Sequence, residues 1–195
     1  MSNCQINQPK ASCGCGSEGE ITDVQPTRKE LTIDFMYLDL AVCTRCQGTE
    51  QNLNEALHEV GHLLSNVGFD ITVNNILVES EAQAEQLQFE SSPTIRINGQ
   101  DIQLTTKESN CASCGTIVGE HVDCRVWEYD GKEYTTPPKS LLIDAILKKV
   151  YSTENHQAQK RKPYVPPENI KNFFKAKKAP NQEDCCNEKR SAQCC

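Results

Sequence analysis

Hydrophobic and polar positions follow two different periods along the middle of the chain, and these periods predict its elements. The stretch 31–42 is mostly apolar and rich in strand formers, which is typical of a buried central strand. Between 53 and 67 the apolar residues recur at steps of three and four, which predicts an amphipathic helix that ends at Gly68. A second strand is expected over 69–79.

Shorter elements follow the second strand. We expect a helix over 80–89 with Ser80 as its N-cap, and a strand over 91–102 that is entered through a proline. A hairpin over 124–135 and a helix over 139–151 complete the series. The order is therefore strand, helix, strand, helix, strand, strand, helix. It predicts an α/β fold with a mixed sheet flanked by helices.

The chain divides into one domain and two arms. Residues 1–29 are polar and without apolar periodicity, which predicts a disordered arm that contains cysteines. The domain extends over 30–151 and includes a polar, cysteine-rich insertion at about 104–124. Residues 152–195 form a basic tail, in which 166–178 are expected to form a short helix. That helix would present three apolar residues, Ile170, Phe173 and Phe174.

Composition and charge exclude several classes of function. Only 37% of the 195 residues are hydrophobic, so part of the chain is expected to lie outside any core. The net charge of −7 argues against general nucleic-acid binding. The acidic body at 1–150 carries a net charge of −11 and the tail at 152–195 carries +4. No apolar run is long enough to span a membrane, and the first residues lack the features of a secretory signal. We therefore expect a cytoplasmic protein without a membrane partner.

Twelve cysteines are the main chemical signal of the sequence. Because the cytosol keeps thiols reduced, cysteines in that compartment are metal ligands or redox groups more often than structural disulfides. They fall into groups separated by long stretches without cysteine, so we expect separate sites. The positions are Cys4, Cys13, Cys15, Cys43, Cys46, Cys111, Cys114, Cys124, Cys185, Cys186, Cys194 and Cys195.

The first site is the CxxC motif Cys43-Thr44-Arg45-Cys46, between a predicted strand and a predicted helix. The start of a helix stabilises a thiolate through its unpaired N–H groups, and Arg45 adds a positive charge. Cys43, at the exposed end of the motif, is the expected nucleophile. Cys46, one turn later, would resolve the mixed disulfide. The same two thiols could also bind a metal ion.

Together with Ser92-Pro93-Thr94 before a later strand, this motif and the element order resemble the thioredoxin-like superfamily over residues 31–151. Closer still, the chain is similar to a prokaryotic thioredoxin-like group classified as a domain of unknown function. The resemblance implies a thioredoxin-like fold, a cis peptide bond before Pro93, and contact of Pro93 with the CxxC motif. It also implies that this proline leaves a strand edge open for a bound substrate. Val42 and Thr44-Arg45 stand where thioredoxins carry Trp and Gly-Pro.

The second site is the insertion, which contains Cys111, Cys114, His121 and Cys124 within fourteen residues. Three thiolates and one imidazole can complete a tetrahedral zinc site, and the metal would supply order to a polar segment. Three thiolates also suit trivalent arsenic. Alternatively, a disulfide between Cys111 and Cys114 would accept electrons from Cys43, or the segment is a loop of free thiols.

The third site consists of two adjacent pairs near the end of the chain, Cys185-Cys186 and Cys194-Cys195. Neighbouring cysteines form only strained disulfides, but each pair offers two soft ligands to one soft ion. The eighteen residues 178–195 are expected to behave as a flexible chain that reaches about 20–25 Å, enough for the pairs to contact Cys43. The pairs resemble the cysteine-pair terminus of mercuric reductases and the vicinal cysteines of arsenic chaperones.

One further motif matches a metalloprotease signature, but we reject it. His58-Glu59-Val60-Gly61-His62 has the pattern HExxH. On the predicted helix, however, both histidines point away from the apolar stripe and toward solvent. Their position therefore does not indicate a protease.

Two functions from different classes remain. The first is thiol–disulfide exchange through Cys43 and Cys46, with Pro93 holding a protein disulfide or thiol partner. The second is binding and transfer of a soft metal or metalloid ion, such as mercury or arsenite, with a role in arsenic or mercury resistance. In it the terminal cysteine pairs would pass the ion to the same dithiol or to the insertion. Only the first would make the protein an enzyme, a thiol–disulfide oxidoreductase.

Overall fold

The computed structural model describes residues 27–119, 121–152 and 164–178. Most of the arm predicted over 1–29 and much of the tail predicted over 152–195 therefore lie outside the described residues. So do seven of the cysteines, at positions 4, 13, 15, 185, 186, 194 and 195.

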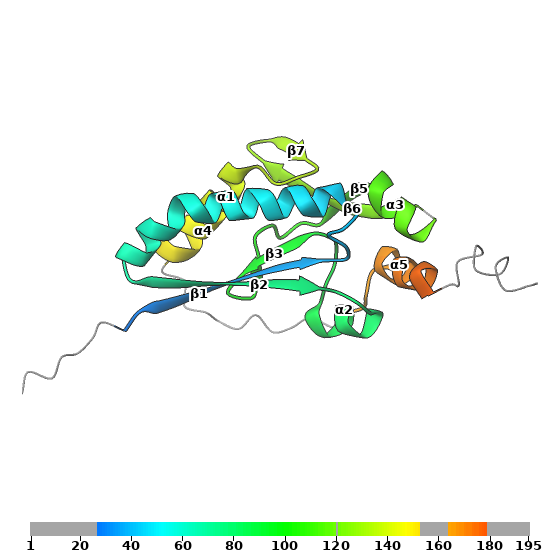
Figure 1. Cartoon of the computed structure of the whole chain (residues 1–195), viewed down its shortest axis with the longest axis horizontal. Coiled ribbons are helices and arrows are strands. Elements are labelled where there is room, and N and C mark those ends of the chain that lie inside the picture. The colour runs from blue at the N-terminus through cyan, green and yellow to red at the C-terminus, as the bar shows by residue number, and fades with distance from the viewer. Residues whose placement is uncertain (1–26, 120, 153–163, 179–195) are drawn as a thin grey trace, which may run out of the picture.

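A mixed sheet of four strands forms the centre of the body (Figure 1). Strand β1 (Lys29–Tyr37) lies between β2 (Phe69–Leu77), which is parallel to it, and β3 (Thr94–Ile97), which is antiparallel. The short β4 (Gln100–Asp101) pairs with β3, giving the order β2-β1-β3-β4. The mixed α/β architecture expected from the sequence is confirmed.

Two helices cover one face of this sheet. Helix α1 (Thr44–Asn66) and helix α4 (Lys139–Tyr151) lie side by side across the strands (Figure 1). Four of the apolar residues expected on the first helix are buried in a core cluster with residues of β1 and α4: Leu53, Ala56, Val60 and Leu64. Leu63 and Val67, expected on the same stripe, are exposed. His58 and His62 are exposed, as expected for side chains that point away from the apolar stripe of α1.

The hairpin expected over 124–135 is present, but it does not join the main sheet. Its strands β6 (Asp123–Tyr129) and β7 (Lys132–Tyr134) form a second sheet with β5 (Lys107–Asn110). The expected mixed sheet is present, and the hairpin adds a second, smaller sheet to it. A strand pattern specifies which residues face inward but not which strand will pair, and here β4 already occupies the edge of β3.

Three short helices surround the end of the body where β1 leads into α1. Helix α2 (Glu81–Leu87) begins at Ser80, whose hydroxyl accepts a hydrogen bond from Gln83 N as expected of an N-cap. Helix α3 (Ala112–Val118) belongs to the insertion, and α5 (Glu168–Lys178) contacts both α2 and α3. The three apolar residues predicted for the tail helix are buried in a cluster that also contains cysteines: Ile170, Phe173 and Phe174.

The insertion thus has a hydrophobic support that the sequence did not indicate. Its cysteines pack with α5 and with residues of the main body in one apolar cluster. Among the described residues, no helix is long and apolar enough to cross a membrane.

Candidate functional site

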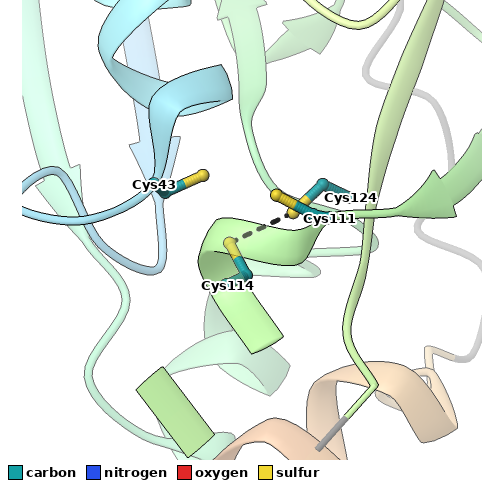
Figure 2. A group of neighbouring side chains, drawn as sticks. All are labelled: Cys43, Cys111, Cys114 and Cys124. Atoms are coloured by element: carbon teal, nitrogen blue, oxygen red, sulfur yellow. Dashed lines mark hydrogen bonds between the residues drawn. The ribbon is translucent and has the colours of Figure 1, made fainter. Parts of the chain in front are cut away.

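Four cysteine side chains converge where the insertion meets the start of α1. The sulfur atoms of Cys43, Cys111, Cys114 and Cys124 all lie within 4.8 Å of one another, and all four residues are buried (Figure 2). A tetrahedral ion with metal–sulfur bonds of about 2.3 Å needs sulfur–sulfur separations of about 3.8 Å. The four sulfurs therefore need only small movements to surround a single ion. We call this set the four-cysteine group.

Cys43 enters the group from the junction of β1 and α1. It is the N-cap of α1, and its sulfur accepts a hydrogen bond of 3.4 Å from the amide of Cys46. We expected Cys43 at the exposed end of its motif, but the residue is 0% exposed. The reason is that the insertion packs over the start of α1. The position of the insertion in the sequence does not reveal this contact.

The other three members come from the insertion. Cys111 precedes α3, and its amide donates to the carbonyl oxygen of Val122 on the segment that returns toward β6. Cys114 lies within α3 and Cys124 lies in β6. Their two sulfur atoms are only 3.3 Å apart (Figure 2). A helix and a strand of one short segment therefore bring three thiols to one point.

Cys46 is buried beside the four-cysteine group but is not a member of it. Its sulfur lies 3.5 Å from the hydroxyl oxygen of Ser92, which also accepts a hydrogen bond from the amide of Leu38. The peptide bond between Ser92 and Pro93 is cis, and Pro93 is buried at the entry to β3. Cys46 and the proline segment are thus adjacent, as the sequence resemblance implied.

Arg45 has a different position from the one its sequence suggested. Its guanidinium donates hydrogen bonds to the backbone carbonyl oxygens of Ser109, Asn110 and Cys124, and to the Ser109 hydroxyl at 3.0 Å. The distance to the Cys124 carbonyl oxygen is 3.1 Å. We expected this charge to act on the Cys43 thiolate. In the structure it joins the first turn of α1 to both strands of the insertion.

His121 lies outside the four-cysteine group. Its side chain is 71% exposed, and its ring contacts the Asn110 amide and the Asp123 carboxylate. The ligand set expected for the insertion therefore needs a correction, because Cys43 and not His121 lies with the three insertion cysteines. The expectation of separate cysteine sites is corrected by the same contact.

A comparison with protein-family models gives one match. Residues 31–146 match the family described as Domain of unknown function (DUF2703). The chain belongs to this family. The DUF2703 match includes all four members of the four-cysteine group, whereas α5 lies beyond it. Comparisons of the chain with curated proteins and with solved structures give no match.

Proton affinities differ strongly among the thiols of this DUF2703 domain. The pKa of Cys43 is well below the usual range because Cys114, Cys124 and Cys46 all donate hydrogen bonds to its sulfur. The pKa of Cys46 is raised by its contact with Cys43 and by burial. The pKa of Cys124 is raised by Cys114, by Cys43 and by burial. For Cys114 the contact with Cys124 lowers the pKa, but hydrogen bonding to Cys43 and burial outweigh it and the net direction is upward.

Chemically, the site is a set of thiols in an apolar pocket, in which hydrogen bonding favours the thiolate form of Cys43 over those of Cys46, Cys114 and Cys124. Thiolate ligands select soft and borderline metal ions. Adjacent thiols also exchange disulfides. The arrangement is therefore compatible with metal binding and with thiol chemistry.

Proposed function

We propose that this protein binds one thiophilic metal or metalloid ion through the four-cysteine group. The observation that carries the proposal is the convergence of four buried sulfurs, all within 4.8 Å of one another, from two parts of the chain. Residues 68 positions apart in sequence, such as Cys43 and Cys111, have no local reason to meet. A shared ion would explain why these cysteines lie together.

The ligand set favours an ion that is held rather than one that performs catalysis. Four protein sulfurs complete a tetrahedral shell and leave no coordination position for a substrate. Zinc fits this shell, and mercuric ion or arsenite could replace it by using two or three of the same sulfurs. Since Cys43 belongs to the body and the others to the insertion, the ion would also fasten the insertion in place.

We propose that the scaffold is thioredoxin-like. Support comes from the strand β1, the CxxC motif at the start of α1, and the Ser92-Pro93 segment beside Cys46. The expected transfer of an ion from Cys185-Cys186 and Cys194-Cys195 lies outside the described residues and stays a prediction. A cytoplasmic location stays a prediction as well.

Thiol–disulfide exchange through Cys43 and Cys46 is a second candidate function. It is favoured by the position of Cys43 at the N-cap of α1, where the Cys46 amide donates to its sulfur. Two observations weigh against a protein partner. Both thiols are 0% exposed, and the amide of Arg125 donates to the Ser92 carbonyl oxygen at 2.7 Å. The resemblance implies that a substrate strand pairs beside Pro93, where β6 of the same chain lies.

The test of ion binding compares two cysteine variants of the full chain. Reduced, ion-free protein is titrated anaerobically with cobalt(II), zinc, arsenite and mercuric ion, and native mass spectrometry counts the bound ions. Cobalt also reports tetrahedral thiolate ligation by its visible absorption. We expect Cys43→Ser to hold one zinc or cobalt ion fewer than wild type and to lose the cobalt–thiolate band.

The matched control is Cys46→Ser, which removes a neighbouring buried thiol that is not in the four-cysteine group. It should keep both the ion and the cobalt band. If Cys43→Ser and Cys46→Ser bind equally, the proposed function is wrong. If instead the reduced protein reduces disulfide substrates, and Cys46→Ser abolishes this while Cys111→Ser does not, the second candidate is favoured.

A further inference from the structure

Five buried thiols meet at this site, and only four of them belong to the four-cysteine group. We infer that in the ion-free protein these thiols exchange a disulfide among themselves, which we call the internal relay. In it a disulfide between Cys114 and Cys124 is transferred to Cys43 and Cys46. The relay goes beyond ion binding, because it needs Cys46 and does not need Cys111.

The first reason is the contact between Cys114 and Cys124. Their sulfurs are 3.3 Å apart, and both residues are 0% exposed. A disulfide bond is about 2.05 Å long, so a small movement of α3 toward β6 joins them. The bound ion and this disulfide exclude each other, since both need the same two sulfurs.

The second reason is that Cys43 lies close both to the pair Cys114 and Cys124 and to Cys46. Its sulfur lies within 4.8 Å of both Cys114 and Cys124. Cys46 follows one turn later in α1, and its amide donates to the Cys43 sulfur at 3.4 Å. Cys43 can therefore exchange with the insertion and then with Cys46 without leaving the pocket.

The third reason is that the backbone holds Cys124 in place. The Arg125 amide donates to the Ser92 carbonyl oxygen at 2.7 Å, next to Cys46. Arg45 donates to the carbonyl oxygen of Cys124 itself at 3.1 Å. Such positioning makes an internal reaction much faster than the same reaction with a free partner. Burial of all five thiols further favours an internal partner over an external one.

The steps balance without an external electron donor. The Cys43 thiolate attacks the Cys124 sulfur, a Cys43–Cys124 disulfide forms, and Cys114 leaves as a thiolate. Cys46 then passes its proton to Cys114 and attacks the Cys43 sulfur, so that Cys43–Cys46 forms and Cys124 leaves. Cys114 and Cys124 are reduced and Cys43 and Cys46 are oxidised. The first disulfide comes from a small-molecule disulfide, which is reduced to two thiols.

Two residues separate the relay from ion binding. Cys111 belongs to the four-cysteine group, but its sulfur contacts the Ser113 hydroxyl at 3.3 Å and the relay does not use it. Cys46 is required by the relay and lies outside the group. Cys111→Ser should therefore impair only ion binding, and Cys46→Ser should impair only the relay.

The test maps disulfides in the full-length, ion-free chain. Wild type, Cys46→Ser and Cys111→Ser are equilibrated anaerobically with increasing ratios of oxidised to reduced glutathione, quenched with acid and alkylated. Trypsin cleaves after Arg45 and separates Cys43 from Cys46. A glutamate-specific protease cleaves after Glu120 and separates Cys114 from Cys124. Mass spectrometry of the peptides then identifies each disulfide. Far-UV circular dichroism checks that each variant is folded, and Cys46→Ala serves as a second variant.

We expect wild type and Cys111→Ser to form both Cys114–Cys124 and Cys43–Cys46. In Cys46→Ser the second step is blocked, so a disulfide from Cys43 to the insertion should accumulate. The relay is overturned if Cys46→Ser and Cys46→Ala form only Cys114–Cys124 at every ratio and leave Cys43 free. This result does not depend on whether the reduced protein binds an ion, which the cobalt titration measures separately.

Discussion

The guanidinium of Arg45 donates a hydrogen bond of 3.1 Å to the backbone carbonyl oxygen of Cys124. This contact joins the middle of the first CxxC motif to the last cysteine of the insertion, 79 residues later. Because the same guanidinium also reaches Ser109 and Asn110, it holds both strands of the insertion at the start of α1. The four-cysteine group exists only while these two parts of the chain remain together.

Replacing Arg45 by alanine should therefore loosen the insertion and expose its thiols. Loss of several hydrogen bonds from one charged group should destabilise the protein by about 1–3 kcal/mol. The rate at which Ellman's reagent modifies the buried thiols of the native protein should rise. A suitable control is Arg28→Ala, since Arg28 makes comparable bonds to Asp70 and Ser65 at the far end of α1. Equal thiol reactivity in the two variants would contradict the role given to Arg45.

His121 should be unnecessary for ion binding. Its ring is on the surface with Asn110 and Asp123, so His121→Ala should leave the affinity for cobalt and zinc unchanged. Cys124→Ala should abolish the tetrahedral cobalt spectrum, because it removes one of the four sulfurs. A loss of affinity in His121→Ala as large as that in Cys124→Ala would restore the ligand set expected from the sequence.

Ion binding should release protons and become tighter as the pH rises. The pKa values of Cys114 and Cys124 are raised, so both thiols are protonated at neutral pH and must lose their protons to bind a metal. The logarithm of the association constant should therefore rise by about two or more per pH unit near neutrality. Cobalt titrations between pH 6 and 8 measure this slope. A slope near zero would mean that these thiols are already ionised.

The stability of the ion-free protein should depend on pH in the opposite direction. The raised pKa values of Cys46, Cys114 and Cys124 favour the folded state while unfolded thiols remain protonated. This contribution is fully present below the unfolded value of about 8.5 and is lost as the pH rises above it. Cys43, whose pKa is lowered, acts in the opposite sense up to about pH 8.5, and its contribution is constant above that value. Urea unfolding of reduced, ion-free protein between about pH 8.5 and pH 10 therefore tests the sign, and added zinc should reverse it.

Helix α5 should support the four-cysteine group without supplying a ligand. Phe173 is 1% exposed and belongs to the apolar cluster that contains the insertion cysteines. Phe173→Ala should cost about 3–5 kcal/mol and raise thiol reactivity. Leu142→Ala, in the other core cluster between α4 and the sheet, is the control and should cost about 2–5 kcal/mol. When the two variants are compared under conditions of equal global stability, the thiols should react faster in Phe173→Ala than in Leu142→Ala. A faster reaction in Leu142→Ala would contradict this account.

Local features of the chain were predictable from the sequence because their causes are local. The period of apolar residues along α1, the N-cap at Ser80 and the buried stripe of the tail helix all depend on neighbours a few positions away. The exposure of His58 and His62 follows from the same helical geometry. The CxxC motif likewise marks the start of α1, where an N-cap cysteine is expected to carry a thiolate.

Which distant residues meet was decided only by the tertiary structure. The sequence by itself determined that the hairpin after Cys124 exists, but not that it pairs with β5 instead of the main sheet. It presented Cys43 and the insertion cysteines as separate groups, because no local pattern records a contact across 68 residues. Burial of α5 against the insertion and the hydrogen bonds of Arg45 hold the two groups together. The presence of Cys43, and not His121, beside the three insertion cysteines is a consequence of that packing.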